Sequence, residues 1–355
     1  MFKLLIINPG STSTKVAVFE QENQILTHNV KHSAQELQQF KRIIDQFEFR
    51  LQHLMDYLQE VKLNLNEITA VVGRGGFLRP LQSGVYEVNE NMLNDLRQSL
   101  NGEHASNLGA VLSHEIASRI PGCKAFIADP VVVDELQDVA RISGLPQFPR
   151  RSAFHALNHK AIARKYARDI GTPYEKLNLV VAHLGGGISV AAHKRGRVID
   201  TNQALDGFGP FSAQRAGTMD AGALIRVCYA GIFEQEEMQK LLVGHGGLVA
   251  HLGTNDLRAA YKLAQNGDLH ARLILEAMAY GVGKEIGSML AVLEGKADAV
   301  ILTGGMAFNE LIVNYITKMI QKMCKVVVYP GEDEMWALAT ASLRVLRGQE
   351  QPREY

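Results

Sequence analysis

The strongest constraint on the fold of this 355-residue chain is a local design that occurs twice. In residues 3–28, an apolar segment leads to the turn Asn-Pro-Gly-Ser-Thr-Ser-Thr-Lys at 8–15, and two further apolar segments follow. In residues 178–202, an apolar segment leads to the turn His-Leu-Gly-Gly-Gly at 183–187, and two apolar segments again follow. Each copy predicts a three-stranded β-meander. The two copies together predict a protein with two like-built halves.

The first turn of each predicted meander consists mainly of small residues, which leave backbone N–H groups and hydroxyl groups uncovered. Such groups suit a phosphate, so two turns of this kind could hold a nucleotide polyphosphate. For residues 8–15, an ordinary hairpin rich in serine and threonine is the structural alternative, and the second copy favours phosphate. In that second copy, the expected phosphate-binding residues are His183, Gly185, Gly186 and Gly187.

The composition argues against several classes of protein. Hydrophobic residues make up 46% and charged residues 21% of the chain, as in soluble globular proteins. Lys+Arg and Asp+Glu are both 37, and this balance argues against a nucleic acid partner. Cys123, Cys228 and Cys324 are far apart and odd in number, which favours a reducing cytoplasm over disulfides. No apolar run approaches the ~18 residues of a membrane span, so we expect a cytoplasmic protein without a membrane partner.

The order of the predicted elements indicates an α/β fold with two domains, each a mixed sheet flanked by helices. Pro146 and Pro149, followed by two arginines, mark a break. We therefore expect one domain at 1–150 and a second at 151–334, with the C-terminal helix at 335–355 completing the first domain. Further helices are predicted at 34–62, 89–98, 104–119, 153–169, 309–323 and 334–347, and further strands at 68–72, 125–128, 299–303 and 325–329.

Two histidines in Phe-His-Ala-Leu-Asn-His, at positions 155 and 159, have the spacing that places both on one helical face. Zinc is not favoured, because no glutamate lies between them as in His-Glu-x-x-His and no third ligand is evident. A hydrogen bond from His155 to a ligand oxyanion is the functional hypothesis, and a buried core histidine is the structural alternative. His104 adds an imidazole at the start of another predicted helix.

Two arginines occupy unusual places in the chain. Arg74 stands between glycines after a predicted strand, and Arg215 lies in a loop that leads into a helix. Two arginines so placed could clamp a phosphoryl group during its transfer, and a structural ion pair is the alternative for each.

Acidic residues after two predicted strands could hold Mg²⁺. Asp129 follows one strand, and the acidic cluster at 332–334 follows another. That cluster also begins the last predicted helix, where negative charge is favourable, so both roles can hold together. Gly304 and Gly305 end a buried strand, and they suit either a ligand or a tight turn. Residues 254–258 predict an N-cap and the first turn of a helix.

Seven short motifs occur in a fixed order along the chain. They are NPGSTSTK (8–15), FHALNHK (154–160), HLGGGIS (183–189), RAGTMD (215–220), NDLR (255–258), LTGG (302–305) and PGEDEMWALA (330–339). Together they resemble the acetate and butyrate kinase family, within the larger class of sugar kinases, Hsp70 and actin. The resemblance covers nearly the whole chain and is closer to the members that act on butyrate.

This resemblance implies roles for individual residues. Asn8, Ser13 and Lys15 would line the phosphate site. His155, Arg215, His104 and Arg74 would contact the transferred phosphoryl group or the carboxylate. Asp129 and Glu334 would organise Mg²⁺, with Glu332 as the alternative to Glu334. Asp256, Arg258, Gly304 and Gly305 would lie near the adenosine. The family also implies a homodimer or a higher homo-oligomer.

The implied reaction is reversible transfer of the γ-phosphoryl group of ATP to a short-chain fatty acid, which gives an acyl phosphate and ADP. A carboxylate is already ionised at pH 7 and needs no general base. Two unit charges ~4 Å apart repel by ~4 kcal/mol at an effective dielectric constant of 20, so the site must offset that repulsion. A nucleotide in the cleft between two closing domains would also be shielded from water.

The acyl chain length is predicted from the substrate pocket, to which Gly73 and Phe154 are assigned. Gly73 stands where acetate kinases carry a valine, and its missing side chain would leave room for about two methylenes. Butyrate is therefore expected over acetate, with isobutyrate, propionate and acetate as alternatives. The alternatives of other classes are a sugar kinase and a nucleotide-dependent binding protein of the actin or Hsp70 type.

Overall fold

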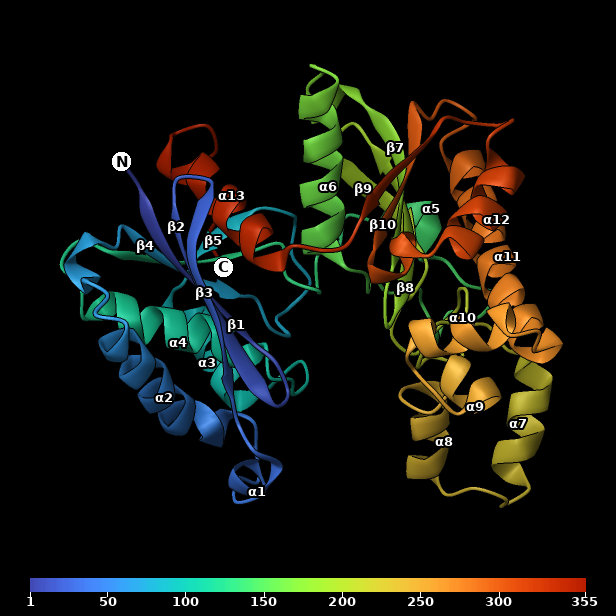
Figure 1. The fold of residues 1–355 in the computed structure, drawn as a ribbon, viewed down its shortest axis with the longest axis horizontal. Helices are drawn as coiled ribbons and strands as arrows, with labels where there is room; N and C mark the ends of the chain where they lie inside the picture. The colour runs from blue at the N-terminus through green and yellow to red at the C-terminus, as the bar shows by residue number, and fades with distance from the viewer. The chain divides into compact units, whose positions relative to one another are not determined.

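The computed structural model describes residues 1–355, and its contacts divide the chain into two compact units (Figure 1). Unit 1 comprises Met1–Val133, Ala156–Ala161 and Asp333–Tyr355, and unit 2 comprises Asp134–His155 and Ile162–Glu332. The C-terminal segment thus belongs to the same unit as the N-terminus. The domain limits predicted from the sequence, 1–150 and 151–334 with 335–355, stay a prediction.

Unit 1 is built on a six-stranded sheet with the order β3-β2-β1-β4-β6-β5. The first three strands form an antiparallel meander, as predicted, and β4 and β6 continue the sheet in parallel with β1. Edge strand β5 is antiparallel to β6. The strands are β1 (Lys3–Pro9), β2 (Ser13–Glu20), β3 (Asn23–Lys31), β4 (Ala70–Arg74), β5 (Val85–Glu87) and β6 (Lys124–Ala128).

Helices cover both faces of this sheet (Figure 1). Leu5 and Ile7 of β1 point to α2, α3 and α4, whereas Leu4 and Ile6 point to α13. Because successive side chains of a strand alternate between the faces, β1 is apolar throughout. The helices are α2 (Phe47–Glu60), α3 (Glu90–Gln98), α4 (Asn107–Ser118) and α13 (Glu334–Leu346).

The segment predicted as helical at 34–62 is interrupted. It forms the single turn α1 (Ala34–Leu37), then a bend, then the 3₁₀ turn η1 (Ile44–Gln46) and α2. Ser33 caps α1 through a capping box with Glu36. A second 3₁₀ turn, η2 (Leu65–Glu67), leads into the strand predicted at 68–72, which forms as β4.

Unit 2 repeats the plan with a five-stranded sheet in the order β11-β10-β7-β8-β9. Its meander, β7 to β9, is antiparallel, and β10 and β11 run parallel to β7. The two like-built halves predicted from the repeat are therefore confirmed. The strands are β7 (Asn178–Leu184), β8 (Ile188–Lys194), β9 (Arg197–Thr201), β10 (Ala299–Gly304) and β11 (Val326–Pro330).

The sheet of unit 2 is also buried on both faces. Alternate residues of β7 and β10 pack against α11 and α12 on one face and against the C-terminal part of α6 on the other. The helices of this layer are α6 (Ala156–Asp169), α11 (Leu269–Val292) and α12 (Glu310–Ile320), with the 3₁₀ turns η3 (Tyr174–Lys176) and η4 (Gly305–Phe308). The first residues of α6 belong to unit 1.

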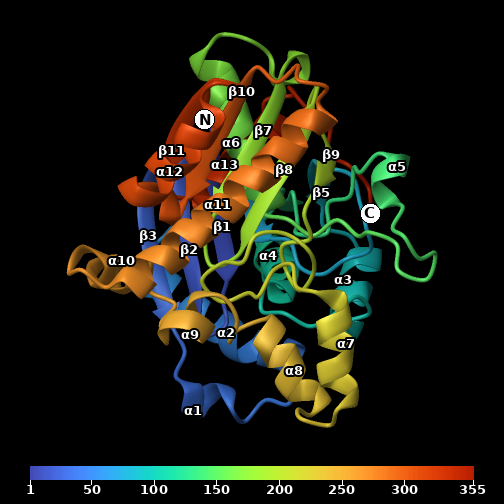
Figure 2. The ribbon, with the colours of Figure 1, turned by 90° about the vertical axis from the view of Figure 1, so that its right-hand side faces the viewer.

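Four further helices of unit 2 lie between β9 and α11 in the sequence. They are α7 (Ala221–Tyr229), α8 (Gln235–Leu242), α9 (Leu248–Leu252) and α10 (Leu257–Gln265), and α5 (Asp138–Arg141) lies earlier in the chain. Figure 2 shows α7 and α8 at one end of the unit, away from its sheet. Neither helix has a buried residue. No helix of the chain has both the length and the apolar character required to cross a membrane.

A buried histidine lies beneath the meander of unit 1. The Nε2 atom of His32 is 2.9 Å from Oγ1 of Thr14 on β2, and its Nδ1 atom has no hydrogen-bond partner. Burial, with a smaller contribution from the positive charge of Arg50, lowers the pKa of His32 to about 4. The ring is therefore neutral at pH 7, and charging it would cost folding free energy.

We predict that this histidine makes folding sensitive to acid. Between about pH 6.5 and pH 4, an unfolded histidine takes up a proton that folded His32 does not bind, so stability is lost as the pH falls through this range. His32→Gln keeps a hydrogen-bonding group and removes the titration. The free energy of unfolding should fall between pH 7 and pH 4 by up to about 3 kcal/mol more in the wild type than in the variant.

Urea unfolding followed by the fluorescence of Trp336 measures this difference in unit 1, since Trp336 on α13 is the chain's single tryptophan. Parallel pH profiles for the wild type and His32→Gln would contradict the prediction.

Candidate active site

In unit 1, the turn at 8–15 joins β1 to β2. Asn8 and Lys15 face each other across the hairpin, and Lys15 is exposed. The N–H of Gly10 donates to the carbonyl of Ser13 at 2.7 Å and closes the turn. Ser11 is exposed at the tip. Two predicted phosphate-site residues, Asn8 and Lys15, thus lie opposite each other, with Ser13 two residues before Lys15 on the same strand.

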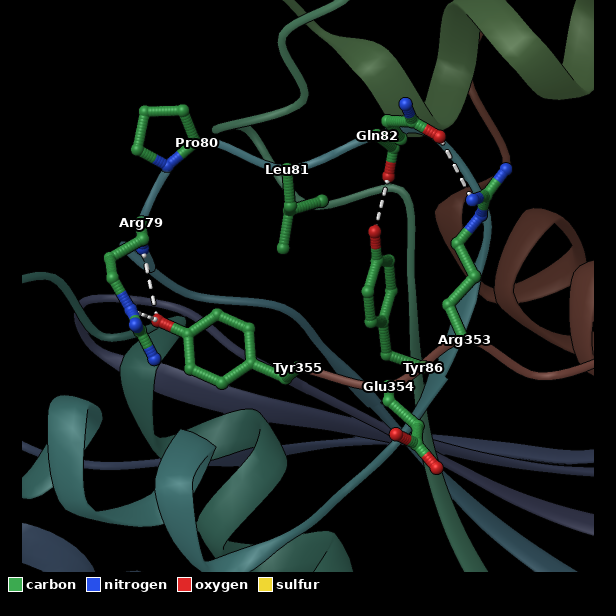
Figure 3. Close-up of a pocket in the computed structure, with 8 residues that line it drawn as sticks. All are labelled: Arg79, Pro80, Leu81, Gln82, Tyr86, Arg353, Glu354 and Tyr355. Carbon is green, nitrogen blue, oxygen red and sulfur yellow. Dashed lines mark hydrogen bonds between the residues drawn. The ribbon is translucent and has the colours of Figure 1, made fainter.

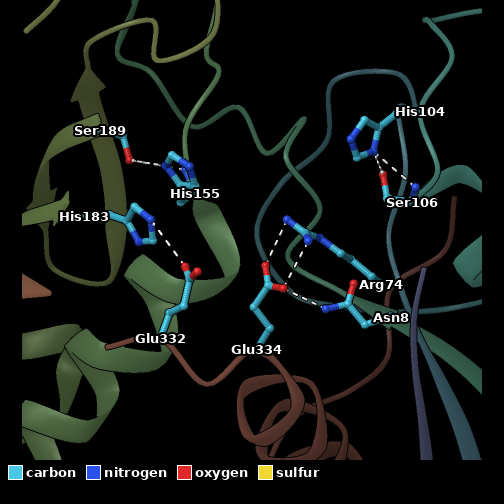
Figure 4. Close-up of polar contacts among 9 residues, drawn as sticks. All are labelled: Asn8, Arg74, His104, Ser106, His155, His183, Ser189, Glu332 and Glu334. Carbon is cyan, nitrogen blue, oxygen red and sulfur yellow. Dashed lines mark hydrogen bonds and ion pairs between the residues drawn. The ribbon is translucent and has the colours of Figure 1, made fainter. Parts of the chain in front are cut away.

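Three strand and helix ends of unit 1 meet at Glu334 (Figure 4). Arg74, the last residue of β4, binds the Glu334 carboxylate through two contacts, Nη2 to Oε1 at 2.9 Å and Nη1 to Oε2 at 3.1 Å. Asn8 donates from Nδ2 to Oε2 at 2.7 Å. The structure thus brings together Asn8, Arg74 and Glu334, which the sequence assigned separately to phosphate, phosphoryl and metal. Both Glu334 oxygens are engaged, so a role of Glu334 on Mg²⁺ stays a prediction.

His104 lies at the turn before α4, and its tautomer is fixed by Ser106. The backbone N–H of Ser106 donates to Nδ1 of His104 at 3.1 Å, and the Ser106 hydroxyl lies 2.8 Å from the same atom (Figure 4). Nδ1 is therefore an acceptor, and the proton of the neutral ring is on Nε2. Burial, and then the nearby charge of Arg74, lower the pKa of His104. The ring can consequently donate one hydrogen bond from Nε2 at pH 7 without being charged.

Asp129 ends β6 and is buried, with a positive φ of 39°. Its Oδ1 atom accepts hydrogen bonds from the Ser83 hydroxyl at 2.6 Å and from the Gly84 N–H at 2.8 Å. These contacts hold the carboxylate in one orientation and leave Oδ2 available. No group of three or more His, Cys, Asp and Glu side chains could hold a metal. A divalent cation here would depend on substrate oxygens and water, which is usual for Mg²⁺.

The role assigned to Gly73 is corrected by its surroundings. A Cβ on Gly73 would lie 2.1 Å from the carbonyl oxygen of Gly109 and 2.5 Å from the hydroxyl of Ser113, both on α4. The residue is glycine because α4 packs directly on β4, so its small size does not open space for an acyl chain. Phe154, the other predicted pocket residue, is buried.

The histidines at 155 and 159 are arranged differently from the prediction, and His155 belongs to unit 2 whereas His159 belongs to unit 1. His155 is the N-cap residue of α6, with φ −79° and ψ 62°, so it lies outside the helical face that bears His159. Its ring instead stacks on His183 of β7, with centroids 3.9 Å apart. Nδ1 of His155 is 2.8 Å from Oγ of Ser189, and Nε2 of His183 is 3.4 Å from a carboxylate oxygen of Glu332 (Figure 4).

Arg215 lies against the glycine turn of unit 2. A Cβ on Gly187 would be 2.0 Å from Nη1 of Arg215, so the absence of a side chain there lets the guanidinium rest on the turn. Nη1 donates to the carbonyl of Ala204. Burial lowers the pKa of Arg215, and Asp206 partly offsets this effect. Arg215, His155, His183 and the turn at 185–187 therefore form one cluster within unit 2.

The remaining predicted residues of unit 2 cap strands and helices. Asp256 is the N-cap of α10, as predicted, and accepts from the N–H of Arg258 at 2.8 Å. Both side chains are exposed. Gly304 ends β10 with φ 91°, and a Cβ there would lie 2.4 Å from the carbonyl oxygen of Leu184. Gly305 has open space around the position of a Cβ.

Three residues of these clusters were not predicted from the sequence. Ser106, two residues after His104, orients that histidine, and Ser189, within the motif at 183–189, orients His155. Arg50 is buried beneath the turn at 8–15. The sequence did contain a sign that Arg50 is buried. It lies three residues after Phe47 and four before Leu54, which places it on the apolar stripe of α2.

Figure 3 shows a separate cavity in unit 1, of ≈ 580 Å³, where the C-terminal tail docks. The hydroxyl of Tyr355 accepts from the backbone N–H and Nε of Arg79, and it donates to Asp95 at 2.7 Å. Arg353 donates to Gln82. The cationic groups of this cavity therefore hold the tail, and no predicted site residue lines it.

The chain is similar to proteins of known class. The model of the Acetokinase family matches residues 147–329. Butyrate kinase 2 of Clostridium acetobutylicum is 51% identical over 354 residues, which cover 100% of this chain and 99% of that protein. Acetate kinase of Porphyromonas gingivalis has the same fold, with a TM-score of 0.80, 19% identity, and coverage of 98% of this chain and 100% of that chain. A propionate kinase from Francisella tularensis gives a TM-score of 0.74 at 21% identity, covering 96% of this chain and 99% of that chain.

Gly304 and Gly305 offer a matched test of the strand end. Gly304→Ala should destabilise the protein by at least about 2 kcal/mol, because it combines a positive φ with a clash against the Leu184 backbone. Gly305→Ala meets nothing within 4 Å and should change stability by less than about 1 kcal/mol. Urea unfolding of both variants measures the difference. Equal losses in the two variants would show that Leu184 does not impose the glycine.

Proposed function

This chain belongs to the acetokinase family, and we propose from that premise that it transfers the γ-phosphoryl group of ATP to butyrate. The products are butanoyl phosphate and ADP, and the reaction is reversible. The observation that carries this proposal is the 51% identity, over the whole chain, to a protein named butyrate kinase 2. The side chains of the two clusters support it, because they are mainly cations and hydrogen-bond donors.

If the phosphoryl group is transferred to a carboxylate, the predominance of cations and hydrogen-bond donors in the site is explained. The acid is ionised at pH 7, so the enzyme has no proton to remove. It must instead reduce the repulsion between an anionic nucleophile and an anionic phosphoryl group. Lys15 and Arg215 bring positive charge, Arg74 brings a guanidinium that Glu334 holds in place, and the neutral ring of His104 brings a donor at Nε2. These are the groups that an attack by one anion on another requires.

We assign the residues as follows. In unit 1, Asn8, Ser13 and Lys15 bind phosphate oxygens, and Arg74 and His104 contact the phosphoryl group or the carboxylate. In unit 2, the turn at 185–187 binds phosphate through the N–H groups of Gly186 and Gly187, since the Gly185 N–H donates to the Gly187 carbonyl. Arg215 stabilises the charge that spreads over the phosphoryl oxygens in the transition state. His155 and His183 donate to the same anions, and Asp256, Arg258, Gly304 and Gly305 lie on the adenosine side.

Mg²⁺ fits this proposal as an ion bound mainly by the phosphates of the nucleotide, where it would neutralise part of their charge. Asp129 is the protein group best suited to it, directly or through water, because Oδ2 is available and Ser83 and Gly84 fix the carboxylate. Glu334 would contribute by holding Arg74 and Asn8 in place.

We further propose that the protein is a cytoplasmic homo-oligomer of at least two copies. Helix α7 and the turn after it expose Ile225, Tyr229 and Ile232, with 58%, 90% and 63% of their surface accessible. A second copy of the chain would cover such an apolar patch, and light scattering of the purified protein measures its mass. The three free cysteines suit a reducing compartment.

We predict that acyl phosphate formation peaks at four carbons. ATP, Mg²⁺ and hydroxylamine are incubated with acetate, propionate, butyrate, isobutyrate and valerate in parallel, because hydroxylamine converts an acyl phosphate to a hydroxamate. The kcat/KM for butyrate should exceed that for acetate by about 10-fold, since two buried methylenes contribute about 0.8 kcal/mol each. Removal of Mg²⁺ by a chelator should abolish the signal. A peak at another acid would replace butyrate as the substrate, and no hydroxamate with any acid would refute the kinase.

We predict that Arg215→Ala lowers kcat much more than it raises the KM for ATP. Removing a cation that acts on the transition state should reduce kcat by about 100-fold or more. The KM for ATP should change by less than about 5-fold if Arg215 binds the ground state weakly. Arg272→Ala is the control, because Arg272 is an exposed arginine of the same unit outside the cluster. An unchanged kcat in Arg215→Ala would remove Arg215 from the mechanism.

A further inference from the structure

Arg50 is a fully buried arginine that lies directly beneath the turn at 8–15. It belongs to α2, and its side chain has 0% of its surface exposed. It makes six hydrogen bonds, and every acceptor is a neutral oxygen. Three of these acceptors are backbone carbonyls of the turn, at Gly10 (2.8 Å), Ser11 (3.0 Å) and Ser13 (3.1 Å). The positive charge is thus placed against the phosphate-binding turn without a carboxylate to balance it.

The remaining contacts of Arg50 fix its orientation. Gln46, one turn earlier on the chain, accepts from Nε at 3.0 Å and from Nη2 at 2.8 Å. Thr14 accepts from Nη1 at 3.2 Å, and the Thr14 hydroxyl in turn contacts His32. His32 is neutral at pH 7, so it adds no second positive charge beside Arg50. The guanidinium is therefore held as a rigid fork between the helix and the turn.

Burying a cation without a counter-charge costs desolvation free energy, so a buried Arg50 implies a compensating role. Burial lowers the pKa of Arg50 to about 10, which still leaves it protonated at pH 7. A neutral side chain could also accept or donate hydrogen bonds here at a lower cost in desolvation. The arrangement becomes favourable when an anion binds on the outer side of the same turn, because its charge offsets that of Arg50.

Arg50 also determines which groups the turn presents. It draws the carbonyls of Gly10 and Ser11 inward. In a trans peptide the N–H points away from the carbonyl of the same unit, so the N–H groups of Ser11 and Thr12 point away from Arg50. Both residues are exposed, and neither N–H has a hydrogen-bond partner in the protein. Successive free N–H groups of this kind form an anion-binding concavity.

We propose that Arg50 is a positioning residue for phosphate binding: it holds the turn at 8–15 in its anion-binding conformation and adds a buried positive charge behind it. This inference rests on the proposed function, in which that turn binds the phosphates of ATP. Arg50 itself touches neither substrate. It acts through the backbone of Gly10, Ser11 and Ser13.

Two substitutions separate the charge from the shape of the side chain. Arg50→Met removes the charge and keeps most of the length, and Arg50→Lys keeps the charge and loses the fork. In the hydroxamate assay, Arg50→Met should raise the KM for ATP by about 10- to 100-fold, the range expected for hydrogen bonds to a charged group, and leave the KM for butyrate within about 2-fold. Arg50→Lys should recover part of that loss. Arg119→Met, which removes an exposed arginine paired with Glu115, is the matched control.

The outcomes decide between positioning and packing. A folded Arg50→Met protein with an unchanged KM for ATP would overturn the proposal, as would an equal rise in the KM for ATP and for butyrate. If Arg50→Met does not fold, the same comparison of the KM for ATP and the KM for butyrate is made with Arg50→Lys, and the same two results would overturn the proposal. Calorimetric titration with ATP is run on all variants. If the wild type forms no acyl phosphate, the proposed function fails, and weaker ATP binding in the Arg50 variants still supports the role of Arg50, whereas equal binding refutes it.

Discussion

Both sheets are covered by helices on their two faces, and this burial leaves the ends of the strands as the places where polar groups can meet a ligand. The predicted site residues of unit 1 lie at or next to the ends of β1 (Asn8), β4 (Arg74) and β6 (Asp129). In unit 2 the corresponding positions are at the ends of β7 (His183) and β10 (Gly304). A strand buried on both faces must be apolar along its length, so chemistry can begin only where the strand stops. Because the meander occurs in both units, each unit places its polar groups at strand ends.

Charge compensation then organises what lies at those ends. Glu334 balances Arg74, whereas Arg50 and Arg215 make hydrogen bonds only to neutral oxygens. Burial lowers the pKa of both arginines, with a partial offset by Asp206 at Arg215, and Arg50, with a pKa of about 10, stays protonated at pH 7. Arg50 has no carboxylate partner and lies behind a turn whose Ser11 and Thr12 N–H groups have no partner in the protein, so this turn suits a highly charged anion. ATP together with a carboxylate is such a ligand set.

The sequence predicted the fold in detail because its signals are local. Continuous apolar segments, glycine turns and helical periodicity each depend on residues close together in the chain, and the two meanders were found from the first two of these signals. The clusters were found only in part. The motif at 183–187 indicated phosphate, but the stacking of His155 on His183 depends on two segments almost 30 residues apart. The contact between Asn8 and Glu334 likewise joins residues from opposite ends of the chain, and no local signal predicts it.

Gly73 and Arg50 show why side-chain roles are harder to predict than elements. A glycine where acetate kinases carry a valine suggests room for a substrate, but the space beside Gly73 is filled by the backbone of α4 at Gly109. An arginine within a helix suggests a solvated face, but Arg50 lies on the stripe that packs under the β1–β2 turn. In both cases the deciding contact comes from an element remote in sequence. The stripe itself was visible, and a charged residue on an apolar helical face is therefore a signal of a buried polar contact, not of an exposed surface.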